Sequence, residues 1–104
     1  MTISRSNENG IITLTPEGWL DTEAAPVLGE AVEEISEAKE LILDFEKVEY
    51  MSSAGLRQVI AAGRKAKTLG AEFSVIHVGS EVMSIFRMSG IDRKIRVLPV
   101  EKNG

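Results

Sequence analysis

The sequence contains no cysteine, and His77 is its only histidine. The lack of cysteine excludes disulfides, thiolate catalysis and cysteine-ligated metals. A single imidazole gives little basis for a zinc site, because such sites combine several nitrogen, sulfur or carboxylate ligands. No glycine-rich phosphate loop of the Walker or dinucleotide type occurs either. We therefore expect neither a resident metal ion nor a cofactor.

Long apolar runs and an excess of basic residues are also missing. The apolar runs fall far short of the roughly 20 residues that a membrane helix needs, and residues 1–10 lack the apolar core of a signal peptide. Lys and Arg total 12 against 16 Asp and Glu, which gives a formal net charge of -4. Such a balance provides no overall attraction to nucleic acid or anionic lipid. The sequence predicts a cytoplasmic protein that binds neither nucleic acid nor membrane directly.

The composition is that of an ordinary globular protein. The chain has 104 residues, of which 43% are hydrophobic and 27% are charged. This length is sufficient for one hydrophobic core and gives no sign of a second unit. We expect a single domain over residues 1–104.

Short apolar segments separated by turn residues indicate alternating strands and helices. Runs rich in β-branched residues predict an edge strand at 2–6, strands at 11–15, 41–45, 73–78 and 95–100, and an extended piece at 19–20. Apolar residues at helical spacing predict helices at 21–38, at 53–69, and from a capping Ser80 to Gly90. This order predicts the α/β class, with a mixed sheet of about four to five strands and helices packed on it.

Two adjacent serines, Ser52 and Ser53, lie where the helix at 53–69 should begin. The first backbone N–H groups of a helix have no internal acceptor, and a serine hydroxyl can cap them. The same position suits a phosphate, because free N–H groups and the helix dipole both favour negative charge. From the residues alone, Ser53 is either a helix cap or a site of modification.

Other polar residues near this segment also allow two interpretations. Asp21 precedes a predicted helix, where it can act as a cap. Asp44 lies near the end of a buried strand, where it can accept hydrogen bonds from loop N–H groups or contribute to a ligand site. Arg57 is either solvated or directed at a partner. A nucleophilic arrangement of Ser53, His77 and Asp44 is disfavoured, because the Gly-x-Ser-x-Gly pattern is absent, and we expect no enzymatic activity.

Four segments together resemble the STAS family, the anti-sigma-factor antagonists. They are Gly18-Trp19-Leu20-Asp21, Leu41-Ile42-Leu43-Asp44-Phe45, Tyr50-Met51-Ser52-Ser53-Ala54-Gly55-Leu56 and Phe86-Arg87-Met88-Ser89-Gly90-Ile91. Their order and spacing match the family over nearly the whole chain. The resemblance implies a STAS fold and a protein that acts by binding.

The resemblance also implies a phosphorylation switch. In the family, the unphosphorylated protein binds an anti-sigma factor that is also a serine kinase, and so releases a sigma factor for transcription. The kinase phosphorylates the antagonist, which then dissociates, and a serine phosphatase of the 2C type restores it. Counting back from Gly55 places the acceptor at Ser53. The family's usual aspartate is replaced by Ser52, which becomes a second candidate acceptor, and a serine is replaced by Ala54.

The resemblance places Asp21 at the same end of the sheet as Ser53, where it could shape the acceptor site together with Asp44, Gly55 and Arg57. A monomer when free fits a protein that exchanges between partners. Two other functions stay open. One is a STAS accessory subunit of an ABC-type transport complex without phosphorylation. The other is a sensor that binds a nucleotide or another small ligand near Asp21, Asp44 and Ser53.

Overall fold

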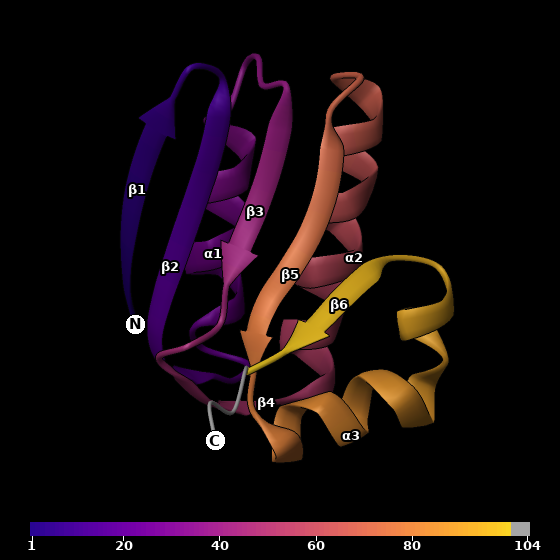
Figure 1. The fold of residues 1–104 in the computed structure, drawn as a ribbon. Coiled ribbons are helices and arrows are strands. Elements are labelled where there is room, and N and C mark those ends of the chain that lie inside the picture. The colour runs from indigo at the N-terminus through magenta and orange to yellow at the C-terminus, as the bar shows by residue number, and fades with distance from the viewer. Residues whose placement is uncertain (101–104) are drawn as a thin grey trace.

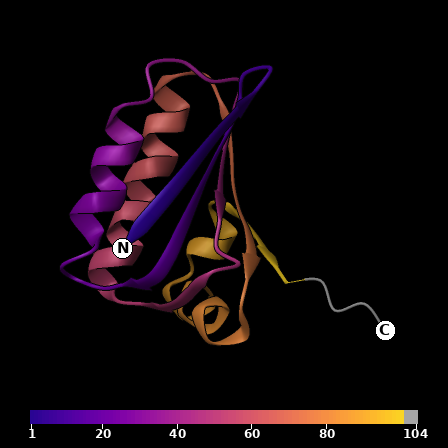
Figure 2. The ribbon, with the colours of Figure 1, turned by 90° about the vertical axis from the view of Figure 1, so that its left-hand side faces the viewer.

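A six-stranded mixed sheet with helices on one face forms the body of the molecule (Figures 1 and 2). The computed structural model describes residues 1–100, so the last four residues of the expected 1–104 domain lie outside the described part. In chain order the elements are β1 (Thr2–Glu8), β2 (Ile11–Leu20), α1 (Ala25–Glu33), β3 (Glu40–Asp44), β4 (Val48–Met51), α2 (Ser53–Thr68), β5 (Glu72–Val78), α3 (Ser80–Ser89), the 3-10 helix η1 (Ile91–Arg93) and β6 (Arg96–Pro99).

The strand order is β1-β2-β3-β5-β6, and β4 pairs with the far end of β2. β1 and β2 form an antiparallel hairpin, whereas the β2–β3, β2–β4, β3–β5 and β5–β6 pairs are parallel. The carboxyl ends of β2, β3, β5 and β6 therefore meet at one edge, which is the lower edge in Figure 1. The predicted α/β class and mixed sheet are confirmed, with six strands where about four to five were expected.

The hydrophobic core lies between the sheet and the two long helices. α1 and α2 cover the same face of the sheet, and α3 lies across its lower end (Figure 2). Side chains from both layers are fully buried, among them Leu14, Leu28, Leu43, Val59 and Val75. Burial of a side chain of this size contributes about 1.5–3 kcal/mol, so these layers supply most of the favourable free energy.

α1 is shorter than the predicted helix at 21–38. Residues 22–24 form a turn, and Pro26 lies in the first turn of the helix, where its missing N–H costs nothing. At the carboxyl end of α1, four carboxylates oppose the helix dipole, and those at i,i+4 spacing repel one another, which disfavours a longer helix. They belong to Glu30, Glu33, Glu34 and Glu37.

β2 is one continuous strand through Pro16, where the sequence predicted a break. Its pairing with β3 ends at Leu14, and its pairing with β4 begins at Gly18. Pro16 falls between the two parallel ladders, so its missing N–H removes no bond from either. Gly18 has a φ of 110°, and the register shift next to it redirects the strand toward β4.

The remaining elements follow the prediction with small changes at their ends. α2 extends over Ser53–Thr68, and β5 and β6 lie within one or two residues of the predicted strands. Gly90 ends α3 as expected, but the cap at its start is Gly79, and Ser80 is the first helical residue. Among residues 1–100, no helix is long and apolar enough to cross a bilayer.

Candidate functional site

The ends of β2 and β4 bring the two most informative sequence segments together. Trp19 pairs with Tyr50 and Leu20 with Met51 in this parallel pair. The backbone N–H of Ser52 continues the contact by donating to the Leu20 carbonyl at 2.9 Å. The turn after β2 and the start of α2 therefore lie side by side at the lower edge of the sheet.

Ser52 is the N-cap of α2. Its backbone is extended, with φ -87° and ψ 174°, and its hydroxyl accepts a hydrogen bond from the Gly55 N–H at 3.3 Å. The hydroxyl also donates to the Leu20 carbonyl at 3.4 Å. The capping role considered for Ser53 thus belongs to Ser52, whose half-buried side chain already has two partners.

Ser53 is the first residue of α2, and its side chain is exposed. Within residues 1–100 its hydroxyl makes no hydrogen bond. The first turn of α2 contains no acidic residue, so the positive end of the helix dipole is uncompensated at this point. An anion placed on the Ser53 oxygen would meet backbone N–H groups and no carboxylate of the same turn.

Gly55 allows the helix to approach the sheet closely. A β-carbon at Gly55 would lie 2.6 Å from the Leu20 carbonyl oxygen and 2.7 Å from the Leu20 Cγ. Gly55 is buried and Ala54 half-buried. A glycine is needed here for the contact between α2 and β2, which holds the first turn of α2, with Ser53, close to the end of β2.

Arg57 lies one helical turn after Ser53, on the same face of α2. It is exposed, and it forms no ion pair with another residue in the described range 1–100. Residues four apart on a helix are neighbours. The spacing along α2 therefore places the Arg57 guanidinium near Ser53.

Asp21 caps the turn that leads into α1. Its carboxylate accepts a hydrogen bond from the Ala24 N–H at 2.9 Å, and its carbonyl accepts one from the Ala25 N–H at 2.9 Å. Asp21 therefore caps this turn and not the helix itself, because the N-cap residue of α1 is Ala24. Asp21 directly follows Leu20, the residue to which Ser52 is bonded, so the acidic turn and the serines share one edge of the sheet.

Asp44 forms a second polar centre, with His77. Its Oδ1 accepts a hydrogen bond from the Glu46 N–H at 3.0 Å and lies 2.9 Å from the His77 Nδ1. The loop hydrogen bond expected for Asp44 is present. Ligand atoms of Asp44, Glu46 and His77 all lie within 4.8 Å of one another, the only such group of three within residues 1–100. Within residues 1–100, the Ser52 and Ser53 hydroxyls form no hydrogen bond with His77.

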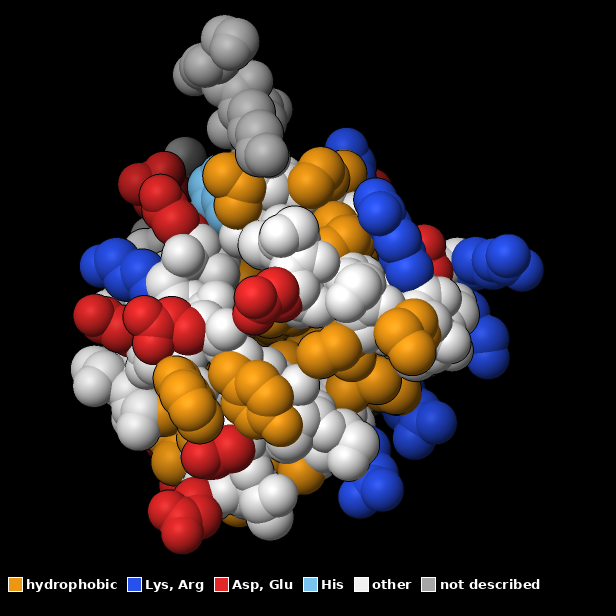
Figure 3. Space-filling view, turned by 90° about the horizontal axis from the view of Figure 1, so that it is seen from below, with side chains coloured by type: hydrophobic (Ala, Val, Ile, Leu, Met, Phe, Trp, Pro, Cys, Tyr) orange, Lys and Arg blue, Asp and Glu red, His pale blue; other side chains and the backbone are white. Residues whose placement is uncertain are grey.

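Trp19 and Tyr50 form an exposed aromatic pair that was not predicted from the sequence. The Trp19 and Tyr50 ring centroids are 5.3 Å apart, and the Trp19 Nε1 donates to the Glu49 Oε2 at 3.2 Å. Figure 3 shows hydrophobic side chains gathered on the lower end of the molecule. Each ring precedes a buried residue, Leu20 or Met51, so strand alternation was the signal that could have revealed their exposure.

Comparisons with known proteins agree with this arrangement. The STAS domain model matches residues 3–103. The anti-sigma-F factor antagonist RsfB of Mycobacterium tuberculosis is 27% identical over 99 residues, which cover 93% of this chain and 80% of RsfB.

Solved structures give the same fold. An anti-sigma factor antagonist from Mycobacterium paratuberculosis has a TM-score of 0.85 at 23% identity, over 94% of this chain and 85% of that one. The Bacillus protein SpoIIAA in its phosphorylated form has a TM-score of 0.72 at 15% identity, over 92% and 90% of the two chains. At these identities the structural likeness concerns the fold alone.

Proposed function

The chain belongs to the STAS domain family, and on this premise we propose that it is a single-domain anti-anti-sigma factor controlled by phosphorylation of Ser53. In its unphosphorylated form it binds an anti-sigma factor that is also a serine kinase, and the bound anti-sigma factor releases its sigma factor for transcription. The role is one of binding, without enzymatic activity. The protein works in the cytoplasm and is a monomer when free.

The relatives support this choice of function. RsfB is described as an anti-sigma-F factor antagonist, and its similarity extends over most of both chains. SpoIIAA, which shares the fold, is known in a phosphorylated form. The likeness to RsfB favours sigma-factor control over the other functions that the sequence leaves open.

The main support for the proposal is that Ser52 and Ser53 have different structural roles. Ser52 caps α2, whereas Ser53 is exposed and its hydroxyl has no partner within residues 1–100. A kinase can therefore reach the Ser53 oxygen without breaking a helix cap. Phosphate on Ser52 would replace both of its hydrogen bonds, so Ser53 is the preferred acceptor and Ser52 the second choice.

A phosphate on Ser53 would act mainly on the partner. It adds about -1.5 to -2 charges and three strong acceptors. At the start of a helix it is compatible with the fold, but at a water-excluding interface it must lose its hydration and face the groups of the partner. Each 1.4 kcal/mol lost in this way weakens binding about tenfold, so a few kcal/mol are sufficient for a switch.

The neighbouring residues would define the acceptor site. Ser52 and Gly55 hold the first turn of α2 against Leu20, and half-buried Ala54 lies between Ser53 and Gly55. Asp21 and Asp44, both at the carboxyl ends of strands, would contribute negative charge to the same edge of the molecule. Arg57 would lie beside the phosphate. A serine phosphatase of the 2C type would remove the phosphate and return the protein to its binding form.

Mass spectrometry tests the proposal. The protein is first incubated with ATP and with the anti-sigma-type kinase that is encoded nearest to its gene. We expect one added phosphate on Ser53, its loss in Ser53→Ala, and its retention in Ser52→Ala. We also expect Ser53→Asp to bind the kinase at least about tenfold more weakly than the native chain.

Other outcomes would redirect the assignment. A tight complex without phosphate transfer to Ser52 or Ser53 would remove the switch and favour an accessory subunit of a transport complex. A rise in melting temperature with a nucleotide, in a chain that binds no kinase, would favour a small-ligand sensor. Phosphate on Ser52 alone would move the acceptor by one residue.

A further inference from the structure

The exposed pair of Trp19 and Tyr50 is the least expected feature of the surface. The chain has three Phe, one Trp and one Tyr. The Trp19 and Tyr50 side chains are 60% and 44% exposed. Their rings are tilted by 44° at a centroid distance of 5.3 Å. Large aromatic side chains left in water in this way are characteristic of protein interfaces, where Trp and Tyr are enriched.

Strand pairing explains only part of this arrangement. Trp19 and Tyr50 are opposite each other in the β2–β4 ladder, and such cross-strand pairs contribute about 0.2–1 kcal/mol to a sheet. That contribution does not require Trp, whose outer face remains in solvent. The Glu49 carboxylate accepts a hydrogen bond from the indole Nε1 at 3.2 Å, which favours one orientation of the exposed ring.

The surroundings of the pair are strongly acidic. Two shallow hollows, each of about 350 Å³, lie in this region of the surface, one beside Trp19 and Val27 and one beside Gly18. Among the described residues, Lys47 is the one basic side chain that lines them. The acidic side chains that line them are Glu17, Asp21, Glu23, Glu46 and Glu49. An aromatic centre with a negative rim is complementary to a positively charged, partly apolar surface.

We propose that Trp19, Tyr50 and Glu49 form a platform that receives an arginine-bearing segment of the anti-sigma factor, separately from the contact at Ser53. We call these three residues the aromatic platform. An arginine side chain fits this site because its guanidinium stacks on aromatic faces and pairs with carboxylates. The inference rests on the proposed function, because the anti-sigma factor is the occupant, and it adds the chemistry that selects this partner.

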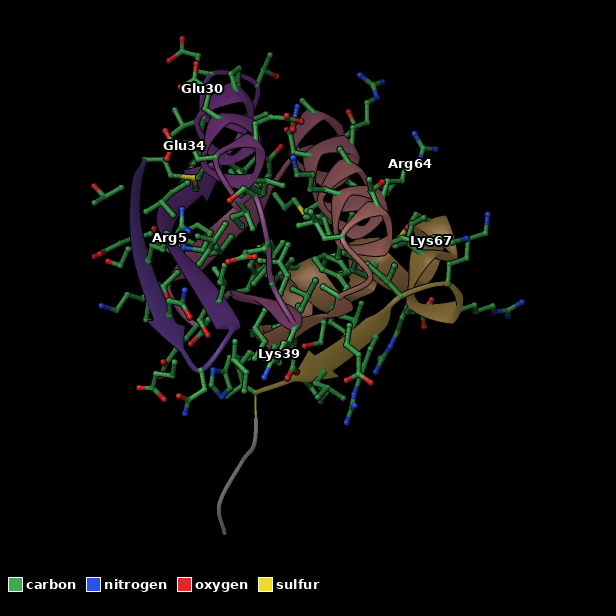
Figure 4. All side chains as sticks on the ribbon, turned by 90° about the horizontal axis from the view of Figure 1, so that it is seen from above. Arg5, Glu30, Glu34, Lys39, Arg64 and Lys67 are labelled. Carbon is green, nitrogen blue, oxygen red and sulfur yellow. The ribbon has the colours of Figure 1, made fainter. Side chains whose placement is uncertain are left out.

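The position of the aromatic platform supports this assignment. Tyr50 lies three residues before Ser53, and Met51 between them is buried, so the platform and the acceptor serine lie at the same edge. Near the platform the chain has Lys47 in one hollow and Arg57 beside Ser53. Arg64 and Lys67 lie farther along α2 and point away from the body (Figure 4). A bound partner would therefore cover the platform and Ser53 together.

Isothermal titration calorimetry with the kinase encoded nearest to the gene of this protein provides the test. We expect Trp19→Ala to raise Kd at least about tenfold, as for an aromatic residue at the centre of an interface. Glu49→Lys should have an effect of the same order and Glu49→Gln a smaller one. The control is Glu34→Gln, which also removes one negative charge. Glu34 lies at the carboxyl end of α1, away from the platform, so this change should leave Kd unchanged (Figure 4).

The outcomes separate the two proposals. If the native chain binds and accepts phosphate, but the Trp19 and Glu49 variants bind equally well and melt normally, the aromatic platform is wrong and the switch stands. If Glu49→Lys instead abolishes self-association seen by sedimentation, the occupant is a second copy, and the partner assignment is overturned.

A second probe applies if the native chain does not bind the kinase, in which case the proposed function fails. Trp19 is the only tryptophan, so its fluorescence reports on the aromatic platform directly. The peptide Leu-Arg-Leu-Arg should shift the Trp19 emission at millimolar concentration, and Leu-Glu-Leu-Glu should not. An equal response to both peptides, or to neither, would overturn the platform as a site for arginine.

Discussion

Gly55 and Leu20 are in direct backbone contact at the start of α2. A β-carbon on Gly55 would lie 2.6 Å from the Leu20 carbonyl oxygen, closer than real β-carbons approach such an atom. The same carbonyl accepts the Ser52 N–H at 2.9 Å. The end of β2 thus holds the segment that carries Ser52 and Ser53, and the fold and the candidate site depend on one contact.

Replacement of Gly55 by alanine should destabilise the protein by about 1–3 kcal/mol, because the added methyl group meets backbone rather than a movable side chain. The matched control is Gly29→Ala in α1. There the β-carbon would meet the Gln58 Oε1 at 2.7 Å, at the end of a flexible side chain. Gly29→Ala should therefore be neutral or stabilise by up to about 1 kcal/mol, the usual gain of alanine in a helix. Urea unfolding of both variants checks the contrast, and a stable Gly55→Ala protein would contradict it.

The two serines should differ in their contribution to stability. Ser52→Ala removes the N-cap and should cost about 1 kcal/mol, which lowers Tm by about 4–8 °C in a domain of this size. Ser53→Ala removes an exposed hydroxyl without a partner among the described residues and should stay within about 0.5 kcal/mol of the native chain. Thermal melting followed by circular dichroism gives both values. A larger loss in Ser53→Ala than in Ser52→Ala would reverse the roles assigned here.

Local patterns in the sequence predicted those elements whose signals are local. The helix from Ser53 was predicted because its apolar residues keep helical spacing, and the buried strand that ends at Asp44 was predicted from its apolar run. The length of the first helix was overestimated, because the apolar spacing continues to Ile35 while charge repulsion and the dipole end α1 at Glu33.

Long-range contacts account for what the sequence did not predict. β4 is short and forms only because the far end of β2 extends beyond its pairing with β3. The exchange of the capping role between Ser53 and Ser52 depends on the Leu20 carbonyl, which is far away in the sequence. The Trp19–Tyr50 pair depends on the same β2–β4 contact. The assignment of Ser53 as the acceptor came from the family resemblance and stays a prediction.

Asp44 and His77 should be energetically coupled. Their side chains are 18% and 42% exposed, and the contact of 2.9 Å joins the ends of β3 and β5. A double-mutant cycle of Asp44→Ala and His77→Ala should give a coupling free energy above about 0.5 kcal/mol. The control is the pair of Glu33 and Lys65, at 3.9 Å with Glu33 80% exposed, where the coupling should be near zero. A coupling free energy near zero for Asp44 and His77 would show that the two side chains act independently.

Phosphate on Ser53 should stabilise the folded protein slightly, even though we expect it to weaken binding. The first turn of α2 has no acidic residue, so a negative group there interacts favourably with the helix dipole, by about 0.3–1 kcal/mol. Arg57, four residues later, can pair with the phosphate and add a further few tenths of a kcal/mol.

Arg57→Ala should therefore lower the Tm of the Ser53-phosphorylated protein more than that of the unphosphorylated protein. The control is Arg64→Ala, three turns after Ser53 in the same helix, which should lower the Tm of both forms equally. The measurement is a set of melting curves of the native, Arg57→Ala and Arg64→Ala proteins, each with and without phosphate on Ser53, at low and high salt. The extra loss of Tm in phosphorylated Arg57→Ala should shrink at high salt, because salt screens the pair of Arg57 and phosphate. If phosphorylation instead lowers Tm by several degrees, the phosphate disrupts the start of α2, and loss of partner binding would follow from partial unfolding rather than from repulsion at an intact interface.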